Sequence, residues 1–129
     1  MQSESSSPPR LGFLQLCADR RYHRKTMLAF ERATGLRPDE YWIEARSGGA
    51  PAYQAATRAA RVAYREGARH MGWAAHGDRC RGFHGASDHE MRQKLGRAAR
   101  ARAGDFRLAT HYELFGEGGE VEVRRAGGQ

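Results

Sequence analysis

LGFLQLCADRR, residues 11–21, gives the clearest local indication of the fold. Its first seven residues form a short apolar run that ends abruptly at Cys17, and polar residues follow at once. This pattern is typical of a buried strand in a parallel sheet, with polar side chains just past its carboxyl end. We therefore predict a strand over residues 11–17 that places Cys17, Asp19 and Arg21 at one edge of a sheet.

Downstream of this stretch, helical and strand-like patterns alternate. The predicted elements, in chain order, are a helix over 22–34, a strand over 40–45, a helix over 51–70, a strand over 71–75, a helix over 87–104 and a β-hairpin formed by 111–115 and 120–124. Ser87 and Glu90 have the spacing of a capping box at the start of the last helix. Alternating strands and helices imply right-handed βαβ crossovers, so we predict an α/β fold with a small, mainly parallel sheet flanked by helices.

The length and composition of the chain indicate one modest domain. The 129 residues are too few for two independent cores, and the 40% hydrophobic content favours a folded protein. We predict a flexible tail over residues 1–10, which is rich in Ser and Pro, and a single domain over residues 11–125. Because much of the apolar content is alanine, the core should be thin, and a second copy of the chain would help to cover it.

Charge and hydropathy restrict the classes of partner. No run of about 18 apolar residues is present, so we expect no membrane span. The polar start lacks the apolar stretch of a secretory signal, so we expect a cytoplasmic protein. The net charge of +7 raises the question of a nucleic-acid or acidic partner, but no nucleic-acid motif accompanies it. We interpret the basic helix as solvated surface and keep a basic interaction module as an alternative; its cations are Arg92, Lys94, Arg97, Arg100 and Arg102.

Cys17, His76 and Cys80 are the candidate metal ligands. The predicted parallel sheet brings the end of the first strand next to the loop that follows the strand over residues 71–75, because sites gather at the carboxyl ends of such strands. Two thiolates and one imidazole suit zinc and leave a fourth position for water, an aspartate or substrate. The alternative is that the two cysteines are ordinary buried residues and that the histidine merely ends a strand.

Two further loops carry polar or glycine-rich sequences at the same predicted edge. Asp19 is either a fourth ligand or an acceptor for a proton of bound water, and Arg21 decides between these roles by holding the carboxylate; a plain surface ion pair is the alternative. The turn that contains Arg46, Gly48 and Gly49 allows the backbone to approach something small, or is a simple connection.

Taken together, these motifs resemble those of the β-class carbonic anhydrases. Residues 17–21, CADRR, match the Cys-x-Asp-x-Arg motif that follows the first strand of that family, and residues 44–50, EARSGGA, resemble the turn after the second strand. Residues 111–123 are similar to the closing strand, so that the resemblance covers residues 11–125. The family spaces its histidine and second cysteine as His-x-x-Cys, whereas this chain has three residues between His76 and Cys80. Either the loop carries an extra residue and His76 still reaches the metal, which we prefer, or the histidine ligand is lost.

The resemblance implies a function and a set of roles. It implies a β-carbonic anhydrase-like domain that binds Zn²⁺ through Cys17, His76 and Cys80 and catalyses the reversible hydration of carbon dioxide to bicarbonate by a zinc-bound hydroxide. Asp19 and Arg21 would have catalytic roles in that reaction. Arg46, Gly48 and Gly49 would lie next to the substrate. It also implies a homodimer or higher homo-oligomer with the active cleft at the interface, while a non-catalytic zinc protein on the same fold is the alternative.

Overall fold

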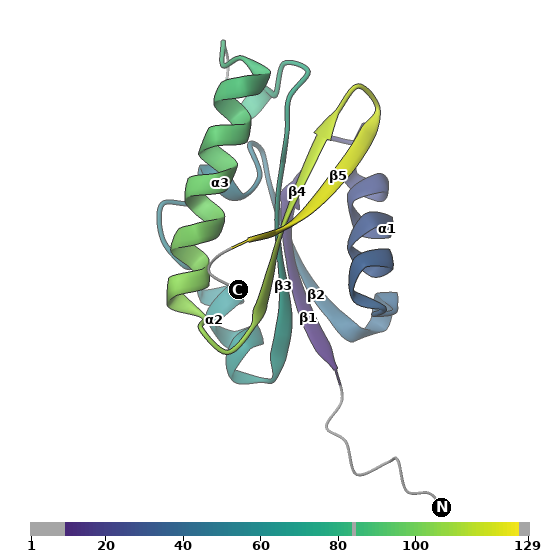
Figure 1. Ribbon diagram of the computed structural model, residues 1–129, viewed down its shortest axis with the longest axis vertical. Coiled ribbons are helices and arrows are strands. Elements are labelled where there is room, and N and C mark those ends of the chain that lie inside the picture. The colour runs from purple at the N-terminus through teal and green to yellow at the C-terminus, as the bar shows by residue number, and fades with distance from the viewer. Residues whose placement is uncertain (1–9, 84, 127–129) are drawn as a thin grey trace, which may run out of the picture.

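The fold is a mainly parallel sheet of five strands, in the order β2-β1-β3-β4-β5 (Figure 1). The computed structural model describes residues 10–83 and 85–126, so the predicted tail lies outside the described residues except for Arg10. The strands are β1 (Leu11–Cys17), β2 (Tyr41–Arg46), β3 (Ala68–His76), β4 (Thr110–Glu117) and β5 (Glu120–Ala126). The first four are parallel and β5 is antiparallel to β4, which confirms the predicted α/β fold.

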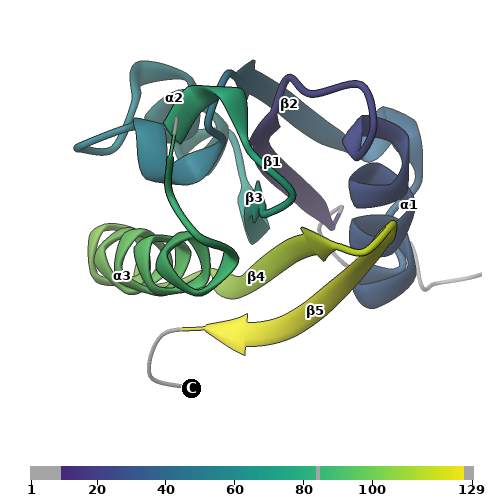
Figure 2. The same cartoon turned by 90° about the horizontal axis from the view of Figure 1, so that it is seen from above.

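Helices cover both faces of the sheet. Helix α1 (His23–Thr34) lies on one face, while α2 (Arg58–Arg65) and α3 (Asp88–Asp105) lie on the other, as the view from above shows (Figure 2). Each face buries its own hydrophobic cluster: Phe13 and Trp73 belong to the cluster under α2 and α3, and Leu14 and Leu114 belong to the cluster under α1. None of the helices that the described residues form has the length and apolarity to cross a bilayer.

Local signals set several element boundaries as predicted. Helix α1 ends at Gly35, which has a φ of 80° and donates its N–H to the carbonyl oxygen of Glu31. At the start of α3, Ser87 Oγ accepts from the N–H of Glu90, and Glu90 Oε1 accepts from the N–H of Ser87, so the capping box is formed. The C-terminal hairpin turns at Gly118 and is antiparallel, also as predicted.

The prediction of a long helix over residues 51–70 is wrong. The chain forms only a short 3-10 turn at Ala50–Ala52 and then α2, and β3 already begins at Ala68. Thr57 caps α2 by accepting from the N–H of Ala60, and Gly67, with a φ of 116°, ends it. The start of β3 pairs with β1 and β4, and these long-range hydrogen bonds outweigh the local helix propensity of the alanine-rich stretch.

One buried histidine lies away from the carboxyl edge of the sheet. His111 is 3% exposed, its Nδ1 accepts from Trp73 Nε1 at 2.9 Å, and its Nε2 donates to the carbonyl oxygen of Phe106 at 2.7 Å. Both ring nitrogens are therefore satisfied within the protein. His111 is a structural histidine that stabilises the position of the largest core side chain.

Candidate metal centre

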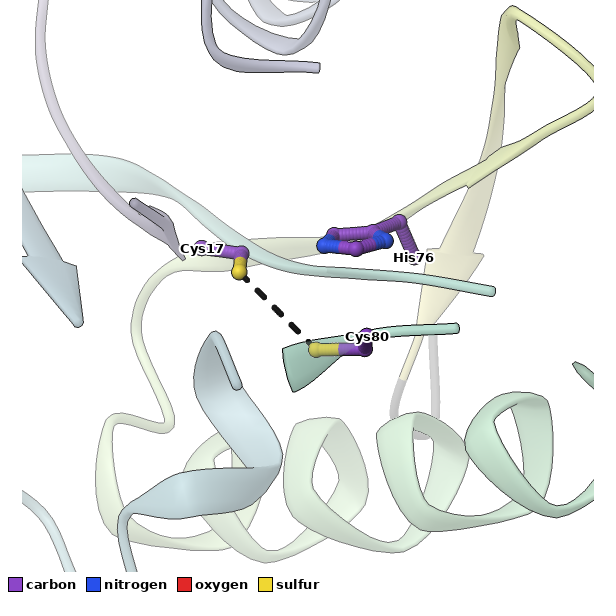
Figure 3. Close-up of side chains that lie close together, drawn as sticks. All are labelled: Cys17, His76 and Cys80. Atoms are coloured by element: carbon purple, nitrogen blue, oxygen red, sulfur yellow. Dashed lines mark hydrogen bonds between the residues drawn. The ribbon is translucent and has the colours of Figure 1, made fainter. Parts of the chain in front are cut away.

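Cys17, His76 and Cys80 meet at the carboxyl edge of the sheet (Figure 3). Cys17 ends β1, His76 ends β3, and Cys80 lies in the loop that follows. One ligand atom from each of the three residues lies within 4.8 Å of the other two, and all three residues are less than 10% exposed. Among residues 10–83 and 85–126, this is the one group of three or more His, Cys, Asp or Glu side chains that could hold a metal ion. It consists of the three predicted ligands.

The two sulfur atoms are spaced for a metal rather than for a disulfide. Cys17 Sγ and Cys80 Sγ are 4.0 Å apart, and both cysteines are free. A disulfide needs an S–S distance of about 2.05 Å. A tetrahedral zinc ion with two Zn–S bonds of about 2.3 Å places its sulfurs about 3.8 Å apart. The observed spacing therefore matches zinc coordination with little movement.

The charge state of the pair favours one thiolate before any metal binds. The hydrogen bond with Cys80 lowers the pKa of Cys17, and His76 and the backbone N–H groups of Asp19 and Gly48 lower it further. The same contact with Cys17, together with burial, raises the pKa of Cys80. These opposite pKa shifts favour a Cys17 thiolate beside a Cys80 thiol, whose proton a divalent cation would displace.

His76 presents one ring nitrogen to the cluster. Its Nδ1 lies 2.6 Å from the carbonyl oxygen of Gly77, and because a carbonyl only accepts, Nδ1 must carry a proton. Its Nε2 is the one fully buried side-chain nitrogen or oxygen in the described part of the chain that has no hydrogen-bond partner. A second ring nitrogen fixed by a carbonyl group is the usual environment of a metal-bound histidine. Nε2 is therefore the atom available to a metal.

The loop between His76 and Cys80 has an unusual backbone. Asp78 and Arg79 have φ values of 53° and 62°, and are the two non-glycine residues with positive φ in the described ranges. Two successive left-handed residues tighten the loop, at a cost of about 1–3 kcal/mol each. The four-residue step from His76 to Cys80 thereby returns Cys80 to the sheet edge.

Asp19 lies beside the cluster and is held by Arg21. Arg21 Nη2 donates to Asp19 Oδ2 at 2.8 Å, Arg21 Nε lies 3.1 and 3.2 Å from the two carboxylate oxygens, and the Arg21 N–H donates to Oδ1 at 2.8 Å. These bonds lower the pKa of Asp19 to about 2. Asp19 Oδ2 is also 3.5 Å from His76 Nε2, so a charged carboxylate faces the position that a metal would take.

The glycine turn after β2 approaches the cluster through its backbone. The Gly48 N–H donates to Cys17 Sγ at 3.3 Å. Gly49 has a φ of 69°, and a Cβ there would lie 2.3 Å from the carbonyl oxygen of Ala74, so this position requires glycine. The Arg46 side chain is exposed and its guanidinium lies over the ring of Tyr53, 4.9 Å from the centroid. Arg46 contributes to the turn through its carbonyl oxygen, which accepts from the N–H of Gly49 at 2.9 Å.

Sequence reasoning did not identify Tyr22 or Asp78 as part of the site. The Tyr22 ring stacks on the His76 imidazole, with centroids 5.1 Å apart and an interplanar angle of 24°. Asp78 bonds the Tyr22 hydroxyl and the turn between β4 and β5. No motif marks either residue, because both act through contacts between distant segments. Near the same loop, His89 is exposed and His84 lies outside the described residues.

Comparison with known proteins supports the fold alone. No family model matches the chain, and no curated protein matches its sequence. Among solved structures, a chain from the crystal structures of two tetrameric β-carbonic anhydrases of the filamentous ascomycete Sordaria macrospora superposes with a TM-score of 0.50. The two chains are 10% identical, and the match covers 92% of this chain and 82% of that chain. At this identity the likeness concerns the arrangement of the strands and helices.

Proposed function

We propose that this protein is a zinc enzyme that catalyses the reversible hydration of carbon dioxide to bicarbonate. The observation that carries the proposal is the buried Cys17–His76–Cys80 cluster, in which His76 Nε2 has no hydrogen-bond partner and the sulfurs are 4.0 Å apart. The Asp19–Arg21 pair beside it and the similarity of the fold to a β-carbonic anhydrase support the same function.

Three residues of the site would hold the metal, and two would control access to it. Cys17, His76 and Cys80 would hold Zn²⁺, which supplies a Lewis acid able to make water nucleophilic at neutral pH. Asp19 is ionised and therefore accepts hydrogen bonds only, so it can orient a reacting water. Arg21 fixes both oxygens of Asp19 and so keeps that carboxylate from becoming a further ligand.

Removal and restoration of the metal test this function. Purified protein should hydrate carbon dioxide in a stopped-flow indicator assay, lose the activity after dialysis against a strong chelator, and regain it with one equivalent of Zn²⁺. Protein that binds zinc without hydrating carbon dioxide would contradict the enzymatic proposal and favour a non-catalytic zinc protein. Salt-dependent binding to nucleic acid by protein without zinc would favour a basic interaction module instead.

We also propose that the protein forms a homodimer through the edge of the sheet at β2. Trp42 and Ile43 on this edge strand are 39% and 43% exposed, and β2 pairs only with β1 within the described chain. An exposed apolar edge strand is a surface that proteins normally cover.

Light scattering at micromolar concentration should therefore give twice the mass of one chain, because pairing of two such edges satisfies their free backbone groups and brings apolar side chains of the two strands into contact. The double substitution Trp42→Lys with Ile43→Lys should give the monomer mass. Leu108→Lys changes a 74% exposed leucine elsewhere and should leave the mass at the dimer value. A wild-type monomer with full activity would contradict the proposal.

A further inference from the structure

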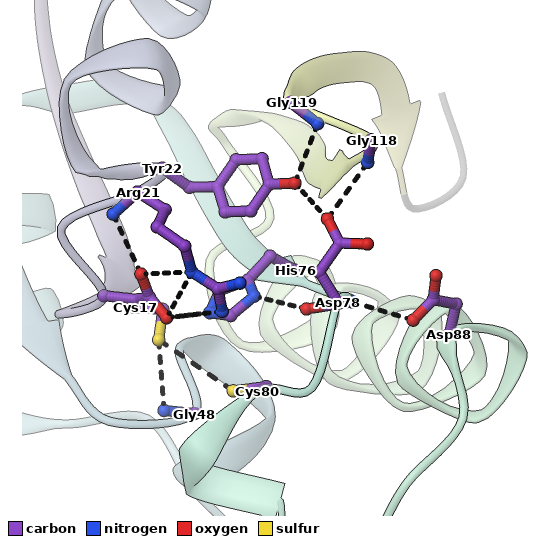
Figure 4. Close-up of polar contacts among 12 residues, drawn as sticks. Cys17, Arg21, Tyr22, Gly48, His76, Asp78, Cys80, Asp88, Gly118 and Gly119 are labelled. Carbon is purple, nitrogen blue, oxygen red and sulfur yellow. Dashed lines mark hydrogen bonds and ion pairs between the residues drawn. The ribbon is translucent and has the colours of Figure 1, made fainter.

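The loop that carries Cys80 is tied to two distant parts of the chain by a single side chain, that of Asp78 (Figure 4). Asp78 Oδ2 accepts from the Tyr22 hydroxyl and from the N–H of Gly118 at 3.0 Å. Gly119 in turn donates its N–H to the Tyr22 hydroxyl oxygen at 3.0 Å. The loop between two metal ligands is thereby connected to the start of α1 and to the turn between β4 and β5.

The same contacts fix the ring of His76. Tyr22 stacks on the imidazole, and the bonds at its hydroxyl hold the phenol ring in that position. The Tyr22 ring lies so close to the backbone of β4 that a Cβ at Gly116 would be 2.5 Å from the Tyr22 ring. The imidazole therefore has a bonded Nδ1 at one edge and a fixed aromatic ring on one face, which leaves little freedom for Nε2 to move.

A third contact supports the loop from α3. Asp88 Oδ1 accepts from the backbone N–H of Asp78 at 2.8 Å. A Cβ at Gly77 would lie 2.3 Å from the same oxygen, so the close approach of Asp88 depends on glycine there. The backbone N–H and the side chain of Asp78, the first of the two left-handed residues, are therefore both held by contacts outside the loop.

We propose that Asp78 is a positioning residue: its carboxylate couples the His76–Cys80 loop to Tyr22 and the β4–β5 turn and so sets the spacing of the metal donors. The proposal rests on the proposed zinc function. A loop with two strained residues would otherwise sample several conformations, and each would move Cys80 Sγ relative to Cys17 Sγ. Outer contacts that orient ligands typically change metal affinity by 10–100-fold.

Asp78→Gly removes the carboxylate without straining the backbone, because glycine tolerates the φ of 53° at this position. In competition with a chromogenic chelator, this variant should bind Zn²⁺ about 10–100-fold more weakly than wild type. Asp78→Asn keeps an oxygen acceptor and tolerates the same φ, so it should restore most of the affinity. Asp39→Ala, at an exposed aspartate in a 3-10 turn far along the chain from the loop, is the matched control and should bind as wild type.

Two further readouts distinguish positioning from general stability. The charge-transfer and ligand-field bands of the Co²⁺-substituted protein should shift in Asp78→Gly and not in Asp39→Ala. The gain in melting temperature on adding Zn²⁺ should be smaller in Asp78→Gly than in wild type, since this gain follows the metal affinity. If Asp78→Gly does not fold, Tyr22→Phe decides: it keeps the stacking and removes the hydroxyl, and should weaken Zn²⁺ binding by about fivefold.

Unchanged affinity and Co²⁺ spectra in Asp78→Gly, or in Tyr22→Phe where that variant decides, would overturn the positioning role while leaving the zinc site in place. A wild-type protein that binds no Zn²⁺ would overturn the proposed function and this inference together. The two failures are therefore separable, because the wild-type measurement comes first.

Discussion

Replacing His76 with alanine should abolish stable zinc binding and reduce carbon dioxide hydration to the uncatalysed rate. The substitution removes the only nitrogen donor of the cluster and leaves two sulfurs, which cannot complete a site of three protein ligands. We expect zinc affinity to fall by more than about 100-fold, because loss of an outer contact alone costs 10–100-fold. Equilibrium competition with a chelator, together with elemental analysis, measures the effect.

His111→Ala is the matched control for this experiment. His111 is also a buried histidine, but both of its nitrogens are hydrogen bonded inside the protein and it lies outside the cluster. The control variant should lose stability, since Trp73 Nε1 loses its acceptor, and yet keep its zinc. Full zinc occupancy in His76→Ala would contradict the assignment. If His84→Ala lost zinc instead, the site would be real and the histidine ligand wrong.

Replacing Arg21 with alanine should separate metal binding from turnover. Arg21 does not belong to the cluster, so zinc content should remain near one per chain. Without the guanidinium, Asp19 is free to move the short distance towards the position that His76 Nε2 faces and to occupy the open coordination position. We expect hydration to fall by about 100-fold or more, as it does when a reacting group is displaced by about 1 Å.

Arg21→Lys should show nearly the same loss, because an ammonium group cannot form the paired N–H contacts that the guanidinium makes with the two oxygens of Asp19. Arg20→Ala is the control, since Arg20 is the exposed neighbour. Hydration of carbon dioxide measured alongside zinc content decides the outcome. Loss of zinc or of folding in Arg21→Ala would make Arg21 structural, and unchanged hydration would contradict the role proposed for Arg21 in holding Asp19 off the metal.

The sequence was sufficient to predict the elements whose signals are local. The apolar run of β1, the capping box of Ser87 and the glycine at position 35 each act through neighbouring residues, and the structure forms all three as expected. The helix over residues 51–70 failed because its outcome depends on distant partners. Ala68 to His70 pair with β1 and β4, and no local pattern reports that pairing.

The same distinction holds for the site. Parallel strand topology predicts that Cys17 and the His76–Cys80 loop share one edge of the sheet, because the carboxyl ends of parallel strands lie there. The return of Cys80 to that edge depends on the left-handed backbone of Asp78 and Arg79, which the sequence does not reveal. The contacts of Asp78 with Tyr22 and Gly118 join segments 56 and 40 residues away, so they depend on where the β4–β5 turn lies in space. Likewise, the family resemblance implies that Arg46 is next to the substrate, but no local pattern reveals that its guanidinium lies over Tyr53.

X-ray absorption at the zinc K-edge of the purified protein tests the central claim most directly, because it counts and identifies the donor atoms. The proposed site predicts two sulfurs at about 2.3 Å and one imidazole nitrogen at about 2.0–2.1 Å, with one further light atom completing a tetrahedron. Protein that contains zinc but shows no pair of sulfur donors, or that contains no zinc at all, would contradict the assignment of Cys17, His76 and Cys80 as its ligands.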